Sequence, residues 1–250
     1  MKKVKMTTSY FRVTIAGIVV LLGVLTIIAS TPKRPIRSVE TTKKITYYFK
    51  AKYQISLTEV ERPEKAGNRY GPKKIYTETS NNKYKFVFED DMIKILWLID
   101  SNQILFLLQN KTDFSIKIPW DEAAYVDEFG RTHRVMHSGV KYTDRDKVQP
   151  PSIIVRKGLI EDLVYPTDYV SWSSGTHLYS GRWETKSLLL TTESYYTYLG
   201  GKSSALREFE EAVNQNIGKQ IQVLLPLDIE DVTHDYIFTF TVEEVNAYSE

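Results

Sequence analysis

The feature that most constrains the fold is an alternation of apolar and polar side chains that begins at Ile45. Over residues 45–58 an apolar side chain occupies every second position, and Tyr48 is the one departure from the pattern. A period of two places successive side chains on opposite faces of an extended chain, whereas a helix repeats every 3.6 residues. The segment is therefore expected to be a long β-strand with one face against a core.

Several later segments show the same alternation, and two others are apolar on both faces. The alternating segments are residues 114–120, 221–227 and 236–242. Residues 92–99 and 104–108 are apolar on both faces, as expected for strands in the middle of a sheet. Turn residues at positions 100–102 predict that these two strands form a hairpin. A second hairpin is expected to join residues 103–109 to 114–120.

One helix interrupts the strands. Across residues 204–217 apolar side chains recur at helical spacing, and the opposite face is rich in Glu, Asn and Gln. Ser203 or Ser204 can cap the start of this helix, and Gly218 is placed to end it. The helix is expected to lie over one open end or edge of the β-fold. The alternative is an acidic helix that docks a basic partner.

These elements predict a mainly β fold. About ten short strands separated by turns are typical of two packed antiparallel sheets, in which each strand buries one face. The immunoglobulin-like β-sandwich is the commonest arrangement of this kind. The predicted fold is therefore an immunoglobulin-like antiparallel β-sandwich with one packed helix, extending over residues 45–250.

The N-terminal segment has a different character. Residues 13–32 carry no charged side chain, and residues 15–28 are nearly all aliphatic. At about 1.5 Å per residue, eighteen helical residues span about 27 Å, close to the hydrocarbon thickness of a bilayer. The predicted organisation is a short tail at 1–12, a transmembrane signal anchor at 13–30, a basic linker at 31–44 and a domain at 45–250. A cleaved signal peptide is the alternative, and the length of the apolar run favours the anchor.

Charge is distributed unevenly between these parts. Residues 1–44 contain nine Lys or Arg and one Glu, which leaves 24 basic and 30 acidic residues in the rest of the chain. An acidic body argues against a nucleic-acid partner, because such a partner requires a basic face. The basic side chains of residues 1–12 favour a cytoplasmic N-terminus, although the basic linker opposes them. The expected partners are the membrane, through residues 13–30, and another envelope or membrane protein that meets the C-terminal domain in the periplasm or at the cell surface.

The absence of cysteine excludes several kinds of site. With no Cys in 250 residues, the chain has no disulfide, no Cys-ligated metal, no thiol nucleophile and no lipid attached through Cys. No cofactor is predicted, because the sequence contains no glycine-rich phosphate loop. The stability of the domain must therefore come from packing.

Two histidines are the weak candidates for a metal site or for acid–base chemistry. His133 and His137 lie four residues apart, a spacing that would place both imidazoles on one face of a helix. Gly130 and Gly139 flank the pair and do not favour a helix. Ser138 next to His137 raises the possibility of Ser/His/Asp chemistry, but no G-x-S-x-G elbow surrounds it. Surface or loop histidines are the favoured interpretation.

Aromatic residues are the more unusual feature of the composition. They make up 12 % of the chain and include seventeen tyrosines. Trp172 and Trp183 flank a Ser/Gly-rich loop that contains Tyr179, and these three residues are the candidate binding patch. The turn-rich residues 138–151 are expected to form a long functional or covering loop.

Part of the chain resembles a loosely defined group of uncharacterised bacterial exported β-sandwich proteins, many of them lipoprotein-like. The residues that carry the resemblance are Asn110-Lys111-Thr112, Ile116, Ile118, Trp120, Tyr125, Gly139-Val140-Lys141-Tyr142, Asp144-Arg145, Pro150-Pro151, Pro166 and Trp183. The resemblance covers about a quarter of the chain and implies an envelope location without an assigned activity. Ser30 stands where the lipoprotein members carry a lipidated Cys, which favours a transmembrane helix as the anchor.

Three functions are compatible with these observations. The first is a membrane-anchored envelope protein of non-enzymatic binding or assembly type. The second is an envelope hydrolase or metal-dependent enzyme that uses His133 and His137. The third is a carbohydrate-binding module that uses exposed Trp172 and Trp183.

Overall fold

The computed structural model describes residues 45–63, 70–80, 83–100, 102–188, 193–198 and 201–249, which all belong to one compact unit. The predicted tail, transmembrane anchor and basic linker, at residues 1–12, 13–30 and 31–44, lie outside the described residues. In the described part of the chain, no helix has the length and apolar character that crossing a bilayer requires.

The described elements are mostly strands. The first half of the chain contains β1 (Ile45–Glu61), β2 (Lys74–Ser80), β3 (Lys83–Glu89), β4 (Ile93–Ile99), β5 (Ile104–Asn110), β6 (Ile116–Ile118), β7 (Ala124–Val126) and β8 (Thr132–Met136). The second half contains β9 (Ser152–Ile154), β10 (Leu159–Pro166), β11 (Val170–Ser173), β12 (Arg182–Thr185), β13 (Glu193–Tyr198), the helix α1 (Lys202–Asn214), β14 (Gln220–Ile229) and β15 (Val232–Ser249). Short 3-10 turns are η2 (Trp120–Glu122), η3 (Tyr142–Asp144) and η4 (Thr167–Tyr169).

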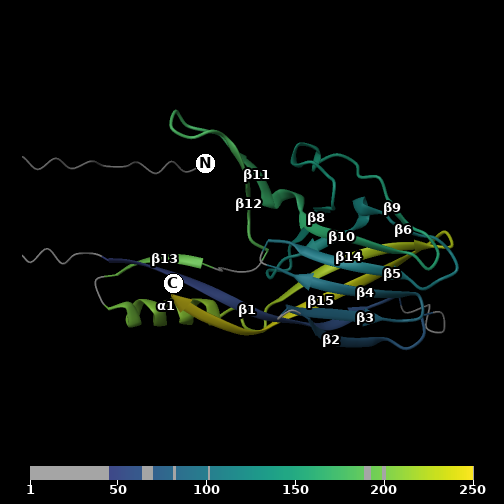
Figure 1. Ribbon diagram of the computed structural model, residues 1–250, viewed down its shortest axis with the longest axis horizontal. Helices are drawn as coiled ribbons and strands as arrows, with labels where there is room; N and C mark the ends of the chain where they lie inside the picture. The colour runs from purple at the N-terminus through teal and green to yellow at the C-terminus, as the bar shows by residue number, and fades with distance from the viewer. Residues whose placement is uncertain are drawn as a thin grey trace, which may run out of the picture. The chain divides into compact units, whose positions relative to one another are not determined.

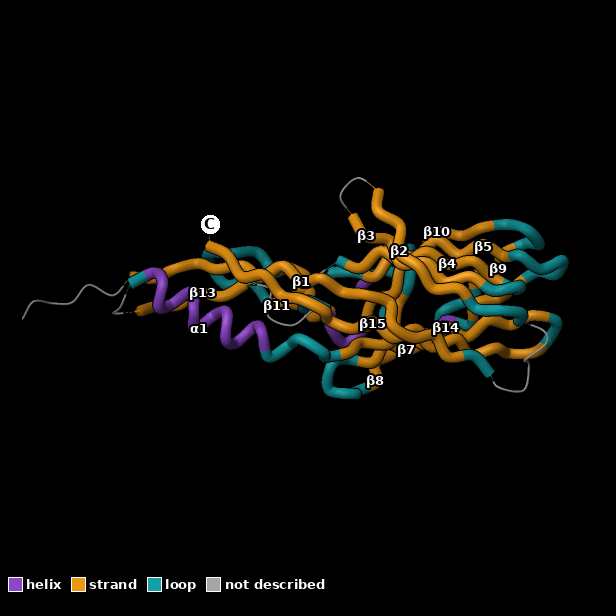
Figure 2. Tube along the Cα trace, turned by 90° about the horizontal axis from the view of Figure 1, so that it is seen from below, coloured by secondary structure: helices purple, strands orange, loops and turns teal. Residues whose placement is uncertain are grey.

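Apart from the β11–β12 hairpin, the described strands form one antiparallel sheet (Figure 1). Hydrogen-bonded neighbours follow the order β13-β1-β15-β14-β7-β8-β10-β5-β4-β3-β2, and β6 and β9 branch from β14. The sheet curls into a nearly closed barrel (Figure 2). The two ends of this strand order approach each other and nearly close the barrel. There β3 contacts β1, and the Nζ of Lys73 donates to the backbone oxygen of Val60 at 3.2 Å.

The predicted immunoglobulin-like β-sandwich is therefore wrong. A sandwich consists of two sheets without a ladder between them, whereas here an unbroken succession of ladders runs from β15 through β14, β7, β8 and β10 to β5. A barrel and a sandwich both bury one face of each strand, so the alternation in the sequence is the same for either. β1 and β15, with 17 and 18 residues, pair along most of their length. Their register shifts after Gln54 and Leu57, and such irregularities increase the bend and twist that curl a sheet.

The alternation itself is confirmed. On β1, Phe49, Ala51, Ile55 and Leu57 are buried, as their positions predict. Trp97 on β4 lies within the core, where its ring centroid is 4.9 Å from that of Phe238. Burying an aromatic or large aliphatic side chain contributes about 1.5–3 kcal/mol, so this core is the main source of stability in a chain without disulfides.

The predicted helix is confirmed, with differences at both ends. It ends at Asn214 and not at residue 217 next to Gly218. The helix begins at Lys202 with Gly201 as its N-cap residue, and neither Ser203 nor Ser204 takes that position. Ala205, Phe209 and Val213 are buried, and the ring of Phe209 stacks on Phe49 with centroids 5.7 Å apart. α1 therefore covers one end of the long strands and contacts β1, β13 and β15 (Figure 1).

One predicted hairpin is confirmed and the other is wrong. β4 and β5 pair antiparallel, from Ile93 opposite Asn110 to Ile99 opposite Ile104. β6, however, pairs with β14 and β9 and not with β5. Asn110 explains the difference, because its buried amide donates to the backbone oxygens of Phe114, Ile154 and Val155. These bonds tie the end of β5 to the β9 segment and lead the chain away from β5.

The sheet opens between β8 and β10. On one side β10 pairs with β5 from Leu159 to Val164. On the other side its ladder with β8 consists of Tyr165 opposite Met136 and Pro166 opposite Val135. The chain leaves β8 after Met136 and runs over this opening as the loop of residues 137–151. The loop predicted at 138–151 therefore lies where the sheet is incomplete.

Candidate functional site

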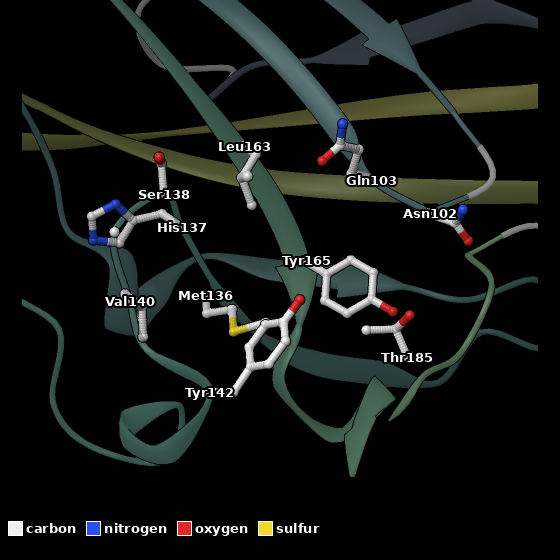
Figure 3. A pocket seen from close by; sticks show the side chains of 11 residues that line it. Asn102, Gln103, Met136, His137, Ser138, Val140, Tyr142, Leu163, Tyr165 and Thr185 are labelled. Carbon is white, nitrogen blue, oxygen red and sulfur yellow. The ribbon is translucent and has the colours of Figure 1, made fainter. Parts of the chain in front are cut away.

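A pocket of about 280 Å³ lies at the opening between β8 and β10. Its lining comes from the turn before β5, the end of β8 with the following loop, β10 and the end of β12. The lining residues are Asn102, Gln103, Met136, His137, Ser138, Gly139, Val140, Tyr142, Leu163, Tyr165 and Thr185. Figure 3 shows Tyr142, Tyr165 and Met136 around the same space, with His137 and Ser138 toward one end of it.

Asp162 of β10 holds the start of the loop in place. Its carboxylate accepts a 2.8 Å hydrogen bond from the backbone N–H of Ser138 and lies 3.2 Å from the Nδ1 of His137. The imidazole of His137 stacks on the indole of Trp120, with centroids 4.4 Å apart and planes at 2°. Asp162 is buried, so these partners supply the hydrogen bonds that a buried carboxylate requires. His137 and Ser138 are thereby fixed at the pocket.

The end of the loop, like its start, is held by hydrogen bonds to neighbouring elements. The side-chain amide of Gln149 is buried and donates to the backbone oxygen of Val135 at 2.7 Å. Asp121 of η2 accepts from the backbone N–H of Gln149 at 3.2 Å and from the guanidinium of Arg134. The start of the loop is thus fixed to β10 and η2 and its end to β8 and η2, which indicates a preformed pocket.

A row of aromatic rings continues from the pocket onto the β11–β12 hairpin. The ring of Tyr142, in the pocket lining, packs edge-on against Trp183 at 5.7 Å, and Trp183 packs edge-on against Trp172 at 5.4 Å. Trp172 and Trp183 are directly opposite each other on β11 and β12. We call Tyr142, Trp183 and Trp172 the aromatic strip. Successive rings meet at 63° and 67°, so the strip presents several separate faces and not one flat platform.

Two neighbours hold the strip in position. The guanidinium of Arg145 lies over the ring of Trp183, 5.4 Å from its centroid. Trp172 lies against the backbone at Gly181, where an added Cβ would come within 2.5 Å of the indole Cζ2. Trp172 still exposes 52 % of its surface, so the far end of the strip is open to solvent.

The tyrosine hydroxyl of β10 remains a neutral hydrogen-bonding group at physiological pH. Burial raises the pKa of Tyr165 to about 12, although contacts with Thr185 and the backbone oxygen of Lys186 oppose this shift. The hydroxyl donates to that backbone oxygen. Tyr165 therefore joins β10 to the segment that follows β12 and presents a neutral ring to the pocket.

The structure does not bring His133 and His137 to a common site. The Nδ1 of His133 lies 2.8 Å from Asp168, and its Nε2 lies 3.2 Å from Asp127, whereas His137 faces Asp162. In the described ranges, no group of three or more His, Asp or Glu side chains is arranged to hold a metal ion. The two histidines thus have separate carboxylate partners, two for His133 and one for His137.

Asp127 stabilises the turn after β7 by accepting hydrogen bonds from its backbone. Burial alone would raise its pKa, but hydrogen bonds from the backbone N–H groups of Arg131 and Phe129 and from His133 outweigh burial and lower it. The Ser/His/Asp possibility lacks its geometry as well, because a triad requires a bond from the serine hydroxyl to the histidine. Within the described residues, the Ser138 hydroxyl makes no hydrogen bond to His137, and Ser138 is bonded through its backbone N–H to Asp162.

The predicted aromatic patch is only partly assembled. Trp172 and Trp183 meet across the β11–β12 hairpin, but Tyr179 lies in the turn that joins these strands and exposes 75 % of its surface. Sequence reasoning missed Tyr142, Tyr165 and Gln103 as members of the same site. Tyr142 had a signal, because it lies in the predicted covering loop. Tyr165 lies on β10 and Gln103 in the turn before β5, and only the fold brings these two residues near the loop.

No protein-family model, curated protein or solved structure matches this chain. The function is therefore inferred from the residues of the site.

Proposed function

We propose that this chain is a membrane-anchored, non-enzymatic binding protein that acts outside the cytoplasm. Its binding site consists of the pocket between β8 and β10 and the adjoining aromatic strip. The anchor is the apolar segment at residues 13–30, followed by the basic linker at 31–44.

The observation that carries the proposal is the continuity of the pocket with the strip. Tyr142 belongs to both, since it lines the pocket and also packs on Trp183. Binding sites typically combine apolar and aromatic walls with a few placed polar groups, and exposed Trp and Tyr side chains are frequent in them. A preformed pocket that leads to an open row of aromatic rings has this composition.

The arrangement of titratable groups supports binding over hydrolysis. Hydrolysis through a serine requires its hydroxyl to lie within hydrogen-bond reach of the base that accepts its proton. In the part of the chain that the structure describes, the Ser138 hydroxyl makes no hydrogen bond to the imidazole of His137, and Ser138 contacts Asp162 only through its backbone N–H. His137 stacks on Trp120 and faces Asp162, so the pair has a structural role in holding the loop.

Protection of the pocket in the cell tests the proposal. The chain contains no cysteine, so Ser138→Cys places a single thiol in the pocket and Val232→Cys places one at the exposed start of β15. A membrane-impermeant maleimide is added to intact cells, and the labelling rates are compared with those of the same full-length variants purified in detergent. The ratio of the Ser138→Cys rate to the Val232→Cys rate corrects for reagent access.

If a ligand occupies the pocket in cells, we expect the ratio of the Ser138→Cys labelling rate to the Val232→Cys labelling rate to be at least about fivefold lower in cells than in purified protein. The reason is that the bound ligand blocks access of the reagent to the pocket. An equal ratio in the two settings would mean that the pocket is unoccupied and would contradict a binding role. Labelling of both variants only after lysis would contradict a location outside the cytoplasm.

A further inference from the structure

We propose that the ligand of this site is a neutral oligosaccharide, with one sugar unit in the pocket and the next units along the aromatic strip. This inference rests on the proposed binding function and specifies the chemistry of the ligand. Three properties of the site lead to it.

The first property is the absence of formal charge among the pocket side chains. Apart from the two tyrosines, His137 is the one lining residue with an ionisable side chain, and its imidazole faces the carboxylate of Asp162. On the strip, the guanidinium of Arg145 lies over Trp183, donates to the backbone oxygen of Tyr142 at 2.9 Å and is paired with Asp146 at 3.7 Å. A phosphate, carboxylate or ammonium ligand would lose its hydration on entering the pocket and would find no opposite charge there. The loss of hydration without a paired charge costs binding free energy. The site therefore favours a neutral ligand.

The second property is a set of uncommitted groups that both donate and accept hydrogen bonds. The side chains of Asn102 and Gln103 make no hydrogen bond within the described structure, and both line the pocket. Amides and hydroxyls offer donors and acceptors together, which matches a ligand with several hydroxyl groups. A hydrocarbon chain would leave these groups unpaired, and each unpaired group costs affinity. This property argues against a lipid tail.

The third property is the alternation of polar groups with aromatic faces. A sugar ring has polar hydroxyls around its edge and C–H groups on its faces, so it can pack flat on an aromatic ring while its hydroxyls bond laterally. Tyr142 and Tyr165 provide such faces beside the amides of the pocket. The pocket volume of about 280 Å³ is just below the range of small-molecule sites, about 300–1,000 Å³, so the pocket holds a small unit.

The strip accounts for the remainder of the ligand. Trp183 and Trp172 continue outward from Tyr142, and each ring is turned by more than 60° from its predecessor. Separate faces at successive positions suit separate sugar units along a twisted chain. Trp172 is 52 % exposed and can receive a unit that leaves the pocket.

Titration of defined oligosaccharides into the full-length protein in nanodiscs tests the ligand class. The probes are the neutral tetramers cellotetraose and tetra-N-acetylglucosamine, with the acidic tetramer of galacturonic acid as the comparison. Binding is followed by intrinsic tryptophan fluorescence and confirmed by calorimetry. At least one neutral tetramer is expected to bind, and the acidic tetramer at least about tenfold more weakly.

Three variants locate the binding. Tyr142→Ala is expected to raise the Kd about tenfold or more. Gln103→Ala leaves the aromatic packing intact and is expected to raise the Kd about threefold or more. Tyr84→Ala removes an exposed ring on β3 and is the matched control, with an unchanged Kd. Equal affinity in all variants, tighter binding of the acidic tetramer, or no binding of either neutral tetramer would overturn the proposal. If the pocket is nevertheless protected in cells, the binding function stands with another ligand class, such as a protein segment; if it is unprotected, the binding function fails as well.

Discussion

Single residues in this protein carry out structural tasks that their type alone does not reveal. Asn110 belongs to a glycosylation-like sequon, yet its side chain is buried and joins three backbone oxygens. Asp162 belongs to a strand, yet it fixes the loop that follows another strand. In both cases a buried polar group has hydrogen-bond partners more than twenty residues away, in addition to local ones.

Tyr165 gives a pH-dependent prediction at this scale. An unfolded tyrosine loses its proton near pH 10, whereas burial raises the pKa of folded Tyr165 to about 12. The unfolded chain therefore ionises first, and the stability from this group, present below about pH 10, is lost as the pH rises toward about 12. Tyr165→Phe is expected to lower the free energy of unfolding at pH 8 by about 0.5–1.5 kcal/mol, through the lost bond to Lys186, and to reduce the decline above pH 10.

Urea unfolding of the full-length protein at pH 8, 10 and 11, followed by near-ultraviolet circular dichroism, measures this effect. Tyr84→Phe, on an exposed ring, is the control. If the free energy of unfolding falls by the same amount between pH 10 and 11 in wild type and in Tyr165→Phe, the raised pKa of Tyr165 does not contribute to the pH dependence of stability.

At the scale of elements, the sequence predicts which segments are strands better than which strands are neighbours. The alternation on β1 and the β4–β5 hairpin follow from residues that are local in the chain. The pairing of β6 with β14 and β9 instead of β5 depends on Asn110, whose partners lie up to 45 residues away. Local patterns cannot show such bonds, so the predicted second hairpin was wrong.

The helix provides a stability prediction. Phe209 is fully buried against Phe49 and attaches α1 to the long strands. Phe209→Ala is expected to lower the free energy of unfolding by about 3–5 kcal/mol, because it removes a large buried side chain and leaves a cavity. Glu208→Ala, on the exposed side of the same helix, is expected to change it by no more than about 0.5 kcal/mol.

Thermal and urea unfolding of both variants test this role. Equal effects of the two substitutions would mean that α1 is not attached through Phe209.

At the scale of the whole molecule, the class of mainly β fold was predictable but the barrel was not. A sandwich and a barrel require the same alternation, and the choice between them depends on whether the ladders continue from β14 through β7, β8 and β10 to β5. The candidate site has the same origin. Trp172 and Trp183 were identified because they flank one loop, whereas Gln103 and Tyr165 come together with Tyr142 only where the barrel opens.

The membrane topology is the prediction that belongs to the whole chain. Ser249→Cys places one thiol near the C-terminus of a chain that otherwise has none. The basic residues 1–12 favour a cytoplasmic N-terminus, so the C-terminal thiol is expected to react with a membrane-impermeant reagent on intact cells. Labelling only after lysis would place the C-terminal domain in the cytoplasm.

The central claim is that the pocket and the aromatic strip bind one ligand, and coupling between them tests it most directly. Ser138→Cys reports occupancy of the pocket, while Trp172→Ala removes a half-exposed ring of the strip that does not line the pocket. The measurement is the maleimide labelling rate of Ser138→Cys in intact cells, alone and combined with Trp172→Ala or with the control Tyr84→Ala. We predict protection in the single variant and with Tyr84→Ala, and faster labelling with Trp172→Ala. Unchanged protection after Trp172→Ala would show that the strip does not share the ligand of the pocket and would contradict the claim.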